Sequence, residues 1–298
     1  MNAEPTDPNE QGIPAEAGHW PDISRLWKQV GQPLRPSAED IGFVTDAIRT
    51  QLPGNPPALA LILGVTPELY NLPWPKKTKV LGSDHTRAMI DAVWPGPRNA
   101  VICAEWTALP LQSGSCNVVL CDGGIHLMAY PDDHRQLVRT LYRVVVSDGL
   151  CIFRLFVPPQ ARETVDEVLN DLAEARIANL NLLKLRLGMA LQENITQGVE
   201  LRRVWDRLHG FAPDFKRLAS QIGWPLEQLM VINTYRDSPV RYYFLTVSDV
   251  RRLFCEDPGG FELERIYWPT YELGERCPTV LFRRRDGRGP MDIRENVP

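Results

Sequence analysis

ALALILG (residues 58–64), KVLGSD (79–84), NAVIC (99–103) and CNVVLCDG (116–123) are four short apolar runs that decide the fold of this chain of 298 residues. Each is followed by a loop and most by a helical pattern, and LCIFRLF (150–156) is a fifth run. Strands that alternate with helices at this spacing are typical of a parallel α/β sheet.

The segments outside these runs read mainly as helices. Residues 1–18 carry acids but no Lys or Arg, which predicts a disordered acidic tail. Apolar residues at helical spacing follow from Trp20, and Ser37-Ala38-Glu39-Asp40 opens a second amphipathic helix. The prolines and glycine of residues 53–57 end this helical segment before the first strand.

A helical insertion is predicted after the fifth strand. Apolar residues from Val165 to Leu187 predict one long amphipathic helix, and further helices are expected over 199–208 and 226–232. The chain is then expected to return to the sheet with Arg241 to Leu245. A helix opened by Thr246 and two strands, over 261–267 and 279–283, follow.

Composition excludes several classes of protein. The formal net charge of -4 argues against nucleic acid as a partner, because a phosphate backbone requires a basic surface. No apolar run approaches the roughly 20 residues that span a membrane, and the N-terminus lacks the pattern of a signal peptide, so we expect a cytoplasmic protein. The six cysteines form no CxxC pair and the histidines have no ligand spacing, so the cysteines are predicted to be core residues and no metal site is expected.

Several motifs of the central region occur in one order. They are Gly64 after the first strand, Asp84 after the second, Glu105 after the third, LPLQSGSCNVVLCDGGIHLM (109–128) and LVRTLYRVVVSDGLCIFRLF (137–156). In this order the segment 58–156 resembles the nucleotide-binding half of class I S-adenosylmethionine-dependent methyltransferases.

The resemblance implies an α/β fold: a Rossmann-like, seven-stranded, mostly parallel sheet with an antiparallel last strand, plus a helical insertion after strand five. It also implies S-adenosylmethionine as the cofactor. The expected organisation is an acidic tail (1–18), an N-terminal helical segment (19–57), the cofactor-binding core (58–157), a helical lid or substrate insertion (158–238), the completion of the sheet (239–286) and a tail (287–298).

The first loop departs from the family pattern. Ile62 stands at the usual acidic position, and Thr66 and Glu68 replace the second and third glycines, so only Gly64 remains. Thr66 is a good N-cap and Pro67 suits the first helical position, so the helix can still direct its amides at the cofactor's methionine carboxylate. Glu68 suits the α-amino group. The alternative is a helix start in a sheet that has lost its cofactor.

The later motifs supply further cofactor-binding candidates. Asp84 matches the acid that accepts hydrogen bonds from the ribose hydroxyls, although a bare Asp after a strand is more often a helix cap. Glu105 matches the acid that binds the adenine amino group, and Trp106 can cover the adenine face or pack at the rim. Asp122 follows the fourth strand at the ligand-binding edge of the sheet.

The catalytic and substrate candidates lie after the fourth strand and at the end of the insertion. Asp122 and His126 are the catalytic candidates, because a histidine titrates near neutrality and can act as a base. The alternative for His126 is packing behind the cofactor. The substrate candidates are Tyr235, Arg236, Arg241 and Tyr242, and the two arginines can equally be surface ion-pair partners.

The first hypothesis is a methyltransferase that moves a methyl group from S-adenosylmethionine to a small-molecule acceptor, at oxygen, nitrogen or carbon, by in-line displacement. The alternative is a catalytically inactive, methyltransferase-like ligand-binding or regulatory protein. A nicotinamide-dependent dehydrogenase does not fit, because Gly64 starts no GxGxxG and Glu68 would repel a pyrophosphate. Apolar faces on the N-terminal and inserted helices make a homodimer plausible.

Overall fold

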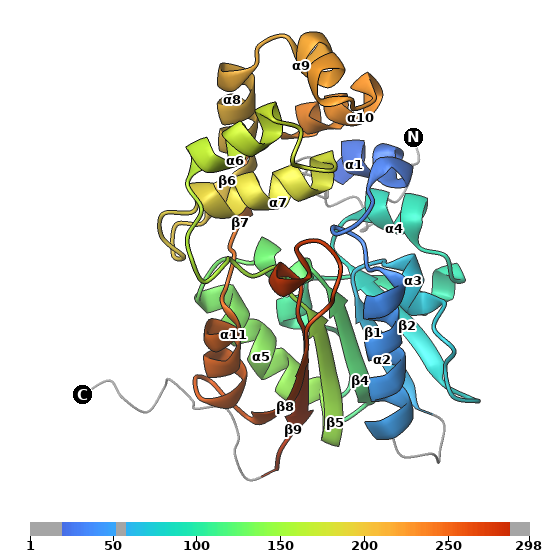
Figure 1. Cartoon of the computed structure of the whole chain (residues 1–298). Coiled ribbons are helices and arrows are strands. Elements are labelled where there is room, and N and C mark those ends of the chain that lie inside the picture. Colours follow the sequence, from blue (N-terminus) through green and yellow to red (C-terminus); the bar gives the residue numbers. More distant parts are fainter. Residues whose placement is uncertain (1–19, 52–57, 287–298) are drawn as a thin grey trace, which may run out of the picture.

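The computed structural model describes residues 20–51 and 58–286. Its centre is a seven-stranded sheet with the order β3-β2-β1-β4-β5-β9-β8 (Figure 1). The strands are β1 (Leu59–Leu63), β2 (Lys79–Asp84), β3 (Val101–Cys103), β4 (Cys116–Asp122), β5 (Val145–Arg154), β8 (Phe261–Tyr267) and β9 (Thr279–Arg284). Neighbours among β1 to β5 pair in parallel, whereas β9 is antiparallel to both β5 and β8. The predicted mostly parallel sheet with an antiparallel last strand is confirmed.

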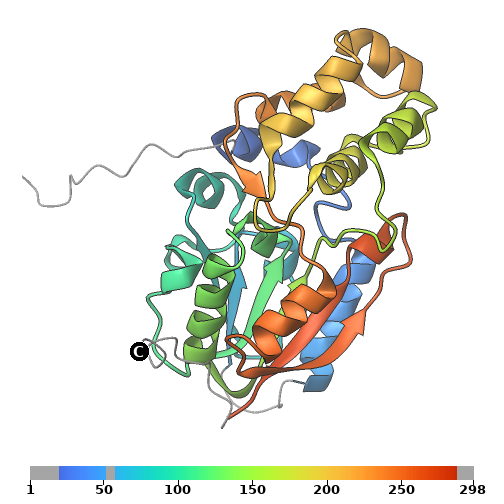
Figure 2. The same ribbon diagram turned by 90° about the vertical axis from the view of Figure 1, so that its left-hand side faces the viewer.

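The sheet is buried on both faces, which explains its nearly continuous apolar strands. Leu61 and Leu63 face the core under α5 (Asp132–Val144) and α11 (Val247–Cys255). Ala60 and Ile62 belong to the opposite core with α2 (Ala38–Gln51) and α4 (Arg87–Val93). Figure 2 shows the green and orange-red helices on one face and the blue helix α2 on the other.

Two helix starts are confirmed by their capping bonds. The Ser37 hydroxyl accepts a hydrogen bond from the Asp40 amide at 3.1 Å, and the Asp40 carboxylate accepts one from the Ser37 amide at 2.8 Å. Thr246 and Asp249 make the same reciprocal pair at the start of α11. Such boxes satisfy amides that the first helical turn leaves without intrahelical partners.

The insertion after β5 forms a helical layer above the carboxyl ends of the strands, beside α1 (Trp20–Leu26), as Figure 1 shows. Its elements are α6 (Val165–Ala173), α7 (Leu180–Leu191), β6 (Val199–Glu200), α8 (Leu201–Phe211), α9 (Phe215–Ile222), α10 (Leu226–Met230), η5 (Val231–Tyr235) and β7 (Arg241–Tyr242). The sequence reasoning did not predict α9.

Two predictions for the insertion are wrong. The expected single long helix is two helices, because Ala175 adopts a positive φ of 54° after α6 and the Asn179 side chain caps α7 by accepting from two amides. The expected return to the sheet at Arg241 does not occur. Arg241 and Tyr242 instead pair antiparallel with Glu200 and Val199 in a separate two-stranded sheet.

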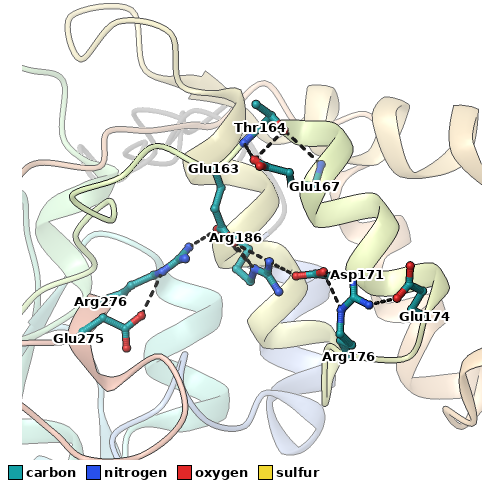
Figure 3. A network of polar contacts seen from close by, with 9 residues as sticks. All are labelled: Glu163, Thr164, Glu167, Asp171, Glu174, Arg176, Arg186, Glu275 and Arg276. Carbon is teal, nitrogen blue, oxygen red and sulfur yellow. Dashed lines mark hydrogen bonds and ion pairs between the residues drawn. The ribbon is translucent and has the colours of Figure 1, made fainter.

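An ion-pair network joins the insertion to the sheet, as Figure 3 shows. Glu163, which precedes α6, forms ion pairs with Arg276 of η6 (Gly274–Arg276) at 2.7 Å and with Arg186 of α7 at 2.6 Å. Arg186 also contacts Asp171 of α6 at 2.5 Å. The network therefore fixes α6 and α7 relative to the loop that leads into β9.

The cysteines are buried at positions 116, 121, 151 and 277, but Cys103 is exposed and Cys255 half-buried, so the expectation of core residues is wrong for Cys103. In the described ranges no group of three or more His, Cys, Asp or Glu side chains is placed to hold a metal ion. No helix in those ranges is long and apolar enough to cross a membrane. The predicted tails and residues 53–57 lie outside the described residues.

Candidate functional site

A cavity lies between the carboxyl ends of the strands and the helical layer. Its floor comes from the ends of β1 and β2 and from the turn after β4. Its roof comes from α1, α7, η5 and β7. Ligands of open α/β sheets bind at this edge, because the strand order reverses there. Residues that bind ligands in this fold should therefore line this cavity.

Three of the residues that the sequence suggests for cofactor binding, Gly64, Thr66 and Asp84, line the cavity. Gly64 has a φ of 101°, and its amide donates to the Ser83 carbonyl at 2.7 Å, which joins the ends of β1 and β2. The Asp84 side chain accepts from the Thr86 amide at 2.8 Å. Burial raises the pKa of Asp84, although hydrogen bonds from Thr86 and the charge of His85 act in the opposite direction.

The helix that follows the first loop is a single turn. This helix, α3 (Pro67–Tyr70), has Thr66 as its N-cap, but the Thr66 side chain makes no capping hydrogen bond. Glu68 does not line the cavity. Its carboxylate contacts Arg35 at 2.5 Å. The dipole expected at this loop is correspondingly weak, because a macrodipole grows from many aligned peptide units.

Trp106 lines the cavity, whereas Glu105 is exposed and does not. The indole Nε1 of Trp106 donates to the Ser83 carbonyl at 2.8 Å, so the ring lies across the ends of β1 and β2. A Cβ at Gly124 would lie only 2.6 Å from this ring, and one at Gly64 would lie 3.9 Å from it. Gly124 thus makes room for the indole, whereas a Cβ at Gly64 would only touch the ring at an ordinary contact distance.

Asp122 lines the cavity and belongs to a buried charge cluster. Its carboxylate accepts from Arg154 Nε at 2.5 Å, and Arg154 Nη1 lies 3.9 Å from Asp40 and donates to the Pro33 carbonyl at 2.8 Å. Burial acts to lower the pKa of Arg154, but the charge of Asp122 and other acidic neighbours hold it above its usual value. Burial raises the pKa of Asp122, and Arg154 acts against that rise.

His126 is buried in a group of aromatic rings on the cavity wall. Its ring centroid lies 4.5 Å from that of Tyr242 and 5.1 Å from that of Phe156. The His126 carbonyl accepts from the Tyr243 amide at 2.7 Å, which links the turn after β4 to β7. These aromatic neighbours fit the alternative that His126 is a packing residue. The imidazole nevertheless lines the cavity.

Of the four substrate candidates, the structure brings the two tyrosines to the cavity and leaves the two arginines outside it. A hydrogen bond joins the phenols of Tyr235 and Tyr242, and burial raises the pKa of Tyr242 to about 12 although that bond acts against the rise. Arg236 lies over the Trp205 ring at 5.2 Å. Arg241 is exposed and forms an ion pair with Glu200. The alternative of a surface ion-pair partner fits Arg241, whereas the contact of Arg236 is with an indole ring.

Lys184 of α7 lines the cavity and was missed by the sequence reasoning. It is only 5% exposed, and its Nζ lies 4.8 Å from the centre of the Tyr235 ring. Burial lowers the pKa of Lys184 to about 7. The available signal was its position within LNLLKLRLGMAL, because a helix that is apolar on all sides is buried and a lysine within it is exceptional.

Comparison with known proteins agrees with this architecture. Residues 63–153 match the family model described as a methyltransferase domain. No curated protein matches the sequence significantly. One similar solved structure is a candidate Zn-dependent alcohol dehydrogenase from Rhodobacter sphaeroides, with 15% identity, a TM-score of 0.57, and coverage of 91% of this chain and 100% of that chain.

A second similar structure is a candidate methyltransferase from Haloferax volcanii, in complex with the Trm112 methyltransferase activator. It has 8% identity, a TM-score of 0.53, and coverage of 91% of this chain and 100% of that chain. At these identities the likeness establishes the fold alone. Over residues 63–153 the chain is similar to this methyltransferase family. The cofactor that this family implies is S-adenosylmethionine.

Proposed function

We propose that the protein transfers a methyl group from S-adenosylmethionine to a small-molecule acceptor. The observation that carries the proposal is the cavity shared by two parts of the chain. Asp84 of the methyltransferase domain and Lys184, Tyr235 and Tyr242 of the inserted helices line the same space. A donor held at the strand ends would therefore meet an acceptor held beneath the helices.

The residues at the strand ends suit the cofactor. Asp84 offers a buried carboxylate for the ribose hydroxyls, and Gly64 leaves space beside it because an added Cβ would meet only the Trp106 ring, at 3.9 Å. Thr66 and the aromatic face of Trp106 complete that wall. Glu68 and Glu105, which the sequence suggested for the amino group and the adenine, do not line the cavity and are not part of this proposal.

The acceptor half favours a small apolar molecule. The roof presents Trp20, Ile23 and Trp27, and the wall presents Phe156, so most of the lining is hydrophobic. Enclosure of this kind excludes water and aligns two reactants, which is most of what methyl transfer from a sulfonium requires. S-adenosylmethionine supplies an electrophilic methyl group there. Asp122 and His126 stay candidates for contact with the reactants in this proposal.

The alternative function is ligand binding without catalysis. It is favoured by the single-turn α3 and by the pairing of Glu68 with Arg35, because the short helix has a weak dipole and the Glu68 carboxylate is already engaged outside the cavity. Only the enzyme converts bound S-adenosylmethionine to S-adenosylhomocysteine.

Isothermal titration calorimetry with S-adenosylmethionine and S-adenosylhomocysteine tests the proposal. Asp84→Asn should weaken binding about 10- to 100-fold, because a hydrogen bond to a charged group contributes roughly 1.5–3 kcal/mol. Asp91→Asn, an exposed acid of α4, is the matched control and should bind normally. Absence of binding to the folded wild-type protein would refute the proposal. Binding without product from any acceptor tried would favour the regulatory alternative.

A further inference from the structure

Lys184 is an unusual group to find at the roof of this cavity. It projects from the middle of α7, whose neighbouring residues Leu183 and Leu185 are buried in the core of the insertion. Burial of a lysine is costly unless the amine loses its charge or acquires a partner. Among the described residues, burial alone accounts for its lowered pKa, with no charged neighbour contributing. Burial therefore favours the neutral amine over the ammonium form.

The other titratable side chains of the cavity are aromatic or have a hydrogen-bond or ion-pair partner of their own. The titratable groups that line the same cavity are Asp84, His85, Asp122, His126, Tyr235 and Tyr242. Asp122 is engaged by Arg154, and burial holds the pKa values of both tyrosines above their usual range. Among the described residues, Lys184 thus supplies the amine that lines this cavity, and its Nζ lies over the Tyr235 ring.

On the basis of the proposed function, we propose that Lys184 is the general base that accepts the proton of a phenolic hydroxyl on an aromatic acceptor. The acceptor class follows from the lining. Tyr235, Tyr242 and Phe156 offer ring faces and edges for a flat aromatic molecule. An aliphatic alcohol is too weak an acid for a neutral amine, and a carboxylic acid has already lost its proton at neutral pH.

The proposed reaction balances with Lys184, the phenol and the methyl donor alone. The phenolic O–H bond breaks, and its proton forms an N–H bond with the neutral amine of Lys184. The oxygen–carbon bond then forms as the carbon–sulfur bond of the donor breaks, with that electron pair left on sulfur. The products are the aryl methyl ether, the thioether and an ammonium group. The Tyr235 ring, 4.8 Å from Nζ, stabilises that ammonium by a cation–π contact.

The test uses 4-nitrophenol as the probe, because its phenolate absorbs visible light and its protonated form does not. The protein is first saturated with S-adenosylhomocysteine, and the probe is then titrated over a range of pH. In the wild-type complex the bound probe should ionise at a pH about one unit lower than in free solution, a tenfold shift in its ionisation constant. Failure of the nucleoside to bind would instead refute the proposed function.

Lys184→Met is the informative variant. Methionine fits the apolar surroundings, so the variant should fold and should bind S-adenosylhomocysteine as the wild type does. It should lose the shift in the probe's ionisation. Lys216→Met, at an exposed position of α9, is the matched control and should keep the shift. Thermal unfolding of both variants verifies that each is folded.

Three results would overturn the assignment. The wild-type complex could bind no 4-nitrophenol, in which case the cavity does not take a phenol. It could bind the probe with unaltered ionisation, in which case Lys184 accepts no proton. Lys184→Met could lose S-adenosylhomocysteine while remaining folded, in which case the lysine holds the cofactor and not the acceptor.

Discussion

Replacing Arg154 with methionine should destabilise the protein more than any surface change, because it leaves two buried carboxylates without their cation. Arg154 Nε contacts Asp122 at 2.5 Å and its Nη1 lies 3.9 Å from Asp40. The arginine side chain is 3% exposed, and those of Asp122 and Asp40 are 6% and 1% exposed. The same guanidinium donates to the Pro33 carbonyl, which leads toward α2.

The size of the expected loss in unfolding free energy follows from the burial of these charges. Removing one partner of a buried ion pair costs roughly 3–5 kcal/mol, because the remaining charge stays desolvated. For a chain of this size each kcal/mol lowers the melting temperature by roughly 2 °C, so Arg154→Met should melt about 6–10 °C below the wild type. Arg49→Met breaks an exposed pair with Asp46 and should cost less than about 1 kcal/mol.

Guanidinium chloride unfolding at pH 7, followed by circular dichroism and tryptophan fluorescence, measures both variants against the wild type. The double variant Arg154→Met with Asp122→Asn should recover part of the loss, because it removes one of the two stranded charges. A loss for Arg154→Met no greater than that for Arg49→Met would refute the reasoning. Such a result would mean that the cluster is solvated in the native state.

Two further predictions concern the supports of the site. Burial raises the pKa of Glu163, but hydrogen bonds from Arg276 and Arg186 outweigh it and hold the pKa below its usual value. A carboxyl group whose pKa is lowered by folding adds stability at neutral pH, and this stability is lost on acidification. Glu163→Gln should therefore lower the free energy of unfolding by roughly 1–3 kcal/mol at pH 7 and by progressively less below about pH 4, as measured by urea unfolding. An equal loss at both pH values would contradict this. Gly124→Ala should displace the Trp106 ring and lower the free energy of unfolding by roughly 1–3 kcal/mol, because the added Cβ would clash with the indole. Calorimetry should also show weaker binding of S-adenosylhomocysteine. Unchanged binding would show that the position of the ring does not matter for the cofactor.

The sheet was predictable because its signal is local and repeated. Apolar strands such as 59–63 and 116–122 are buried on both faces, so their sequences are apolar throughout, and parallel strands place their carboxyl ends at one edge. That geometry is why Asp84 and Asp122, far apart in sequence, were both expected at the cavity, where they lie.

The insertion was less predictable because irregular backbone decides where its helices end and which of its side chains face the cavity. A helical pattern continues across Ala175 although the positive φ there ends α6. Tyr235 and Tyr242 point to the cavity while their neighbours Arg236 and Arg241 pair elsewhere, and sequence proximity does not distinguish these directions. Lys184 was missed because a lysine in a helix is ordinarily exposed.

A crystal structure of the protein with S-adenosylhomocysteine tests the central claim most directly. The nucleoside should lie in the cavity at the strand ends, with its ribose hydroxyls bound to the Asp84 carboxylate and its sulfur facing the space beneath Lys184 and Tyr235. Ligand bound at any other surface, or a cavity without ligand in crystals grown at saturating concentration, would contradict it.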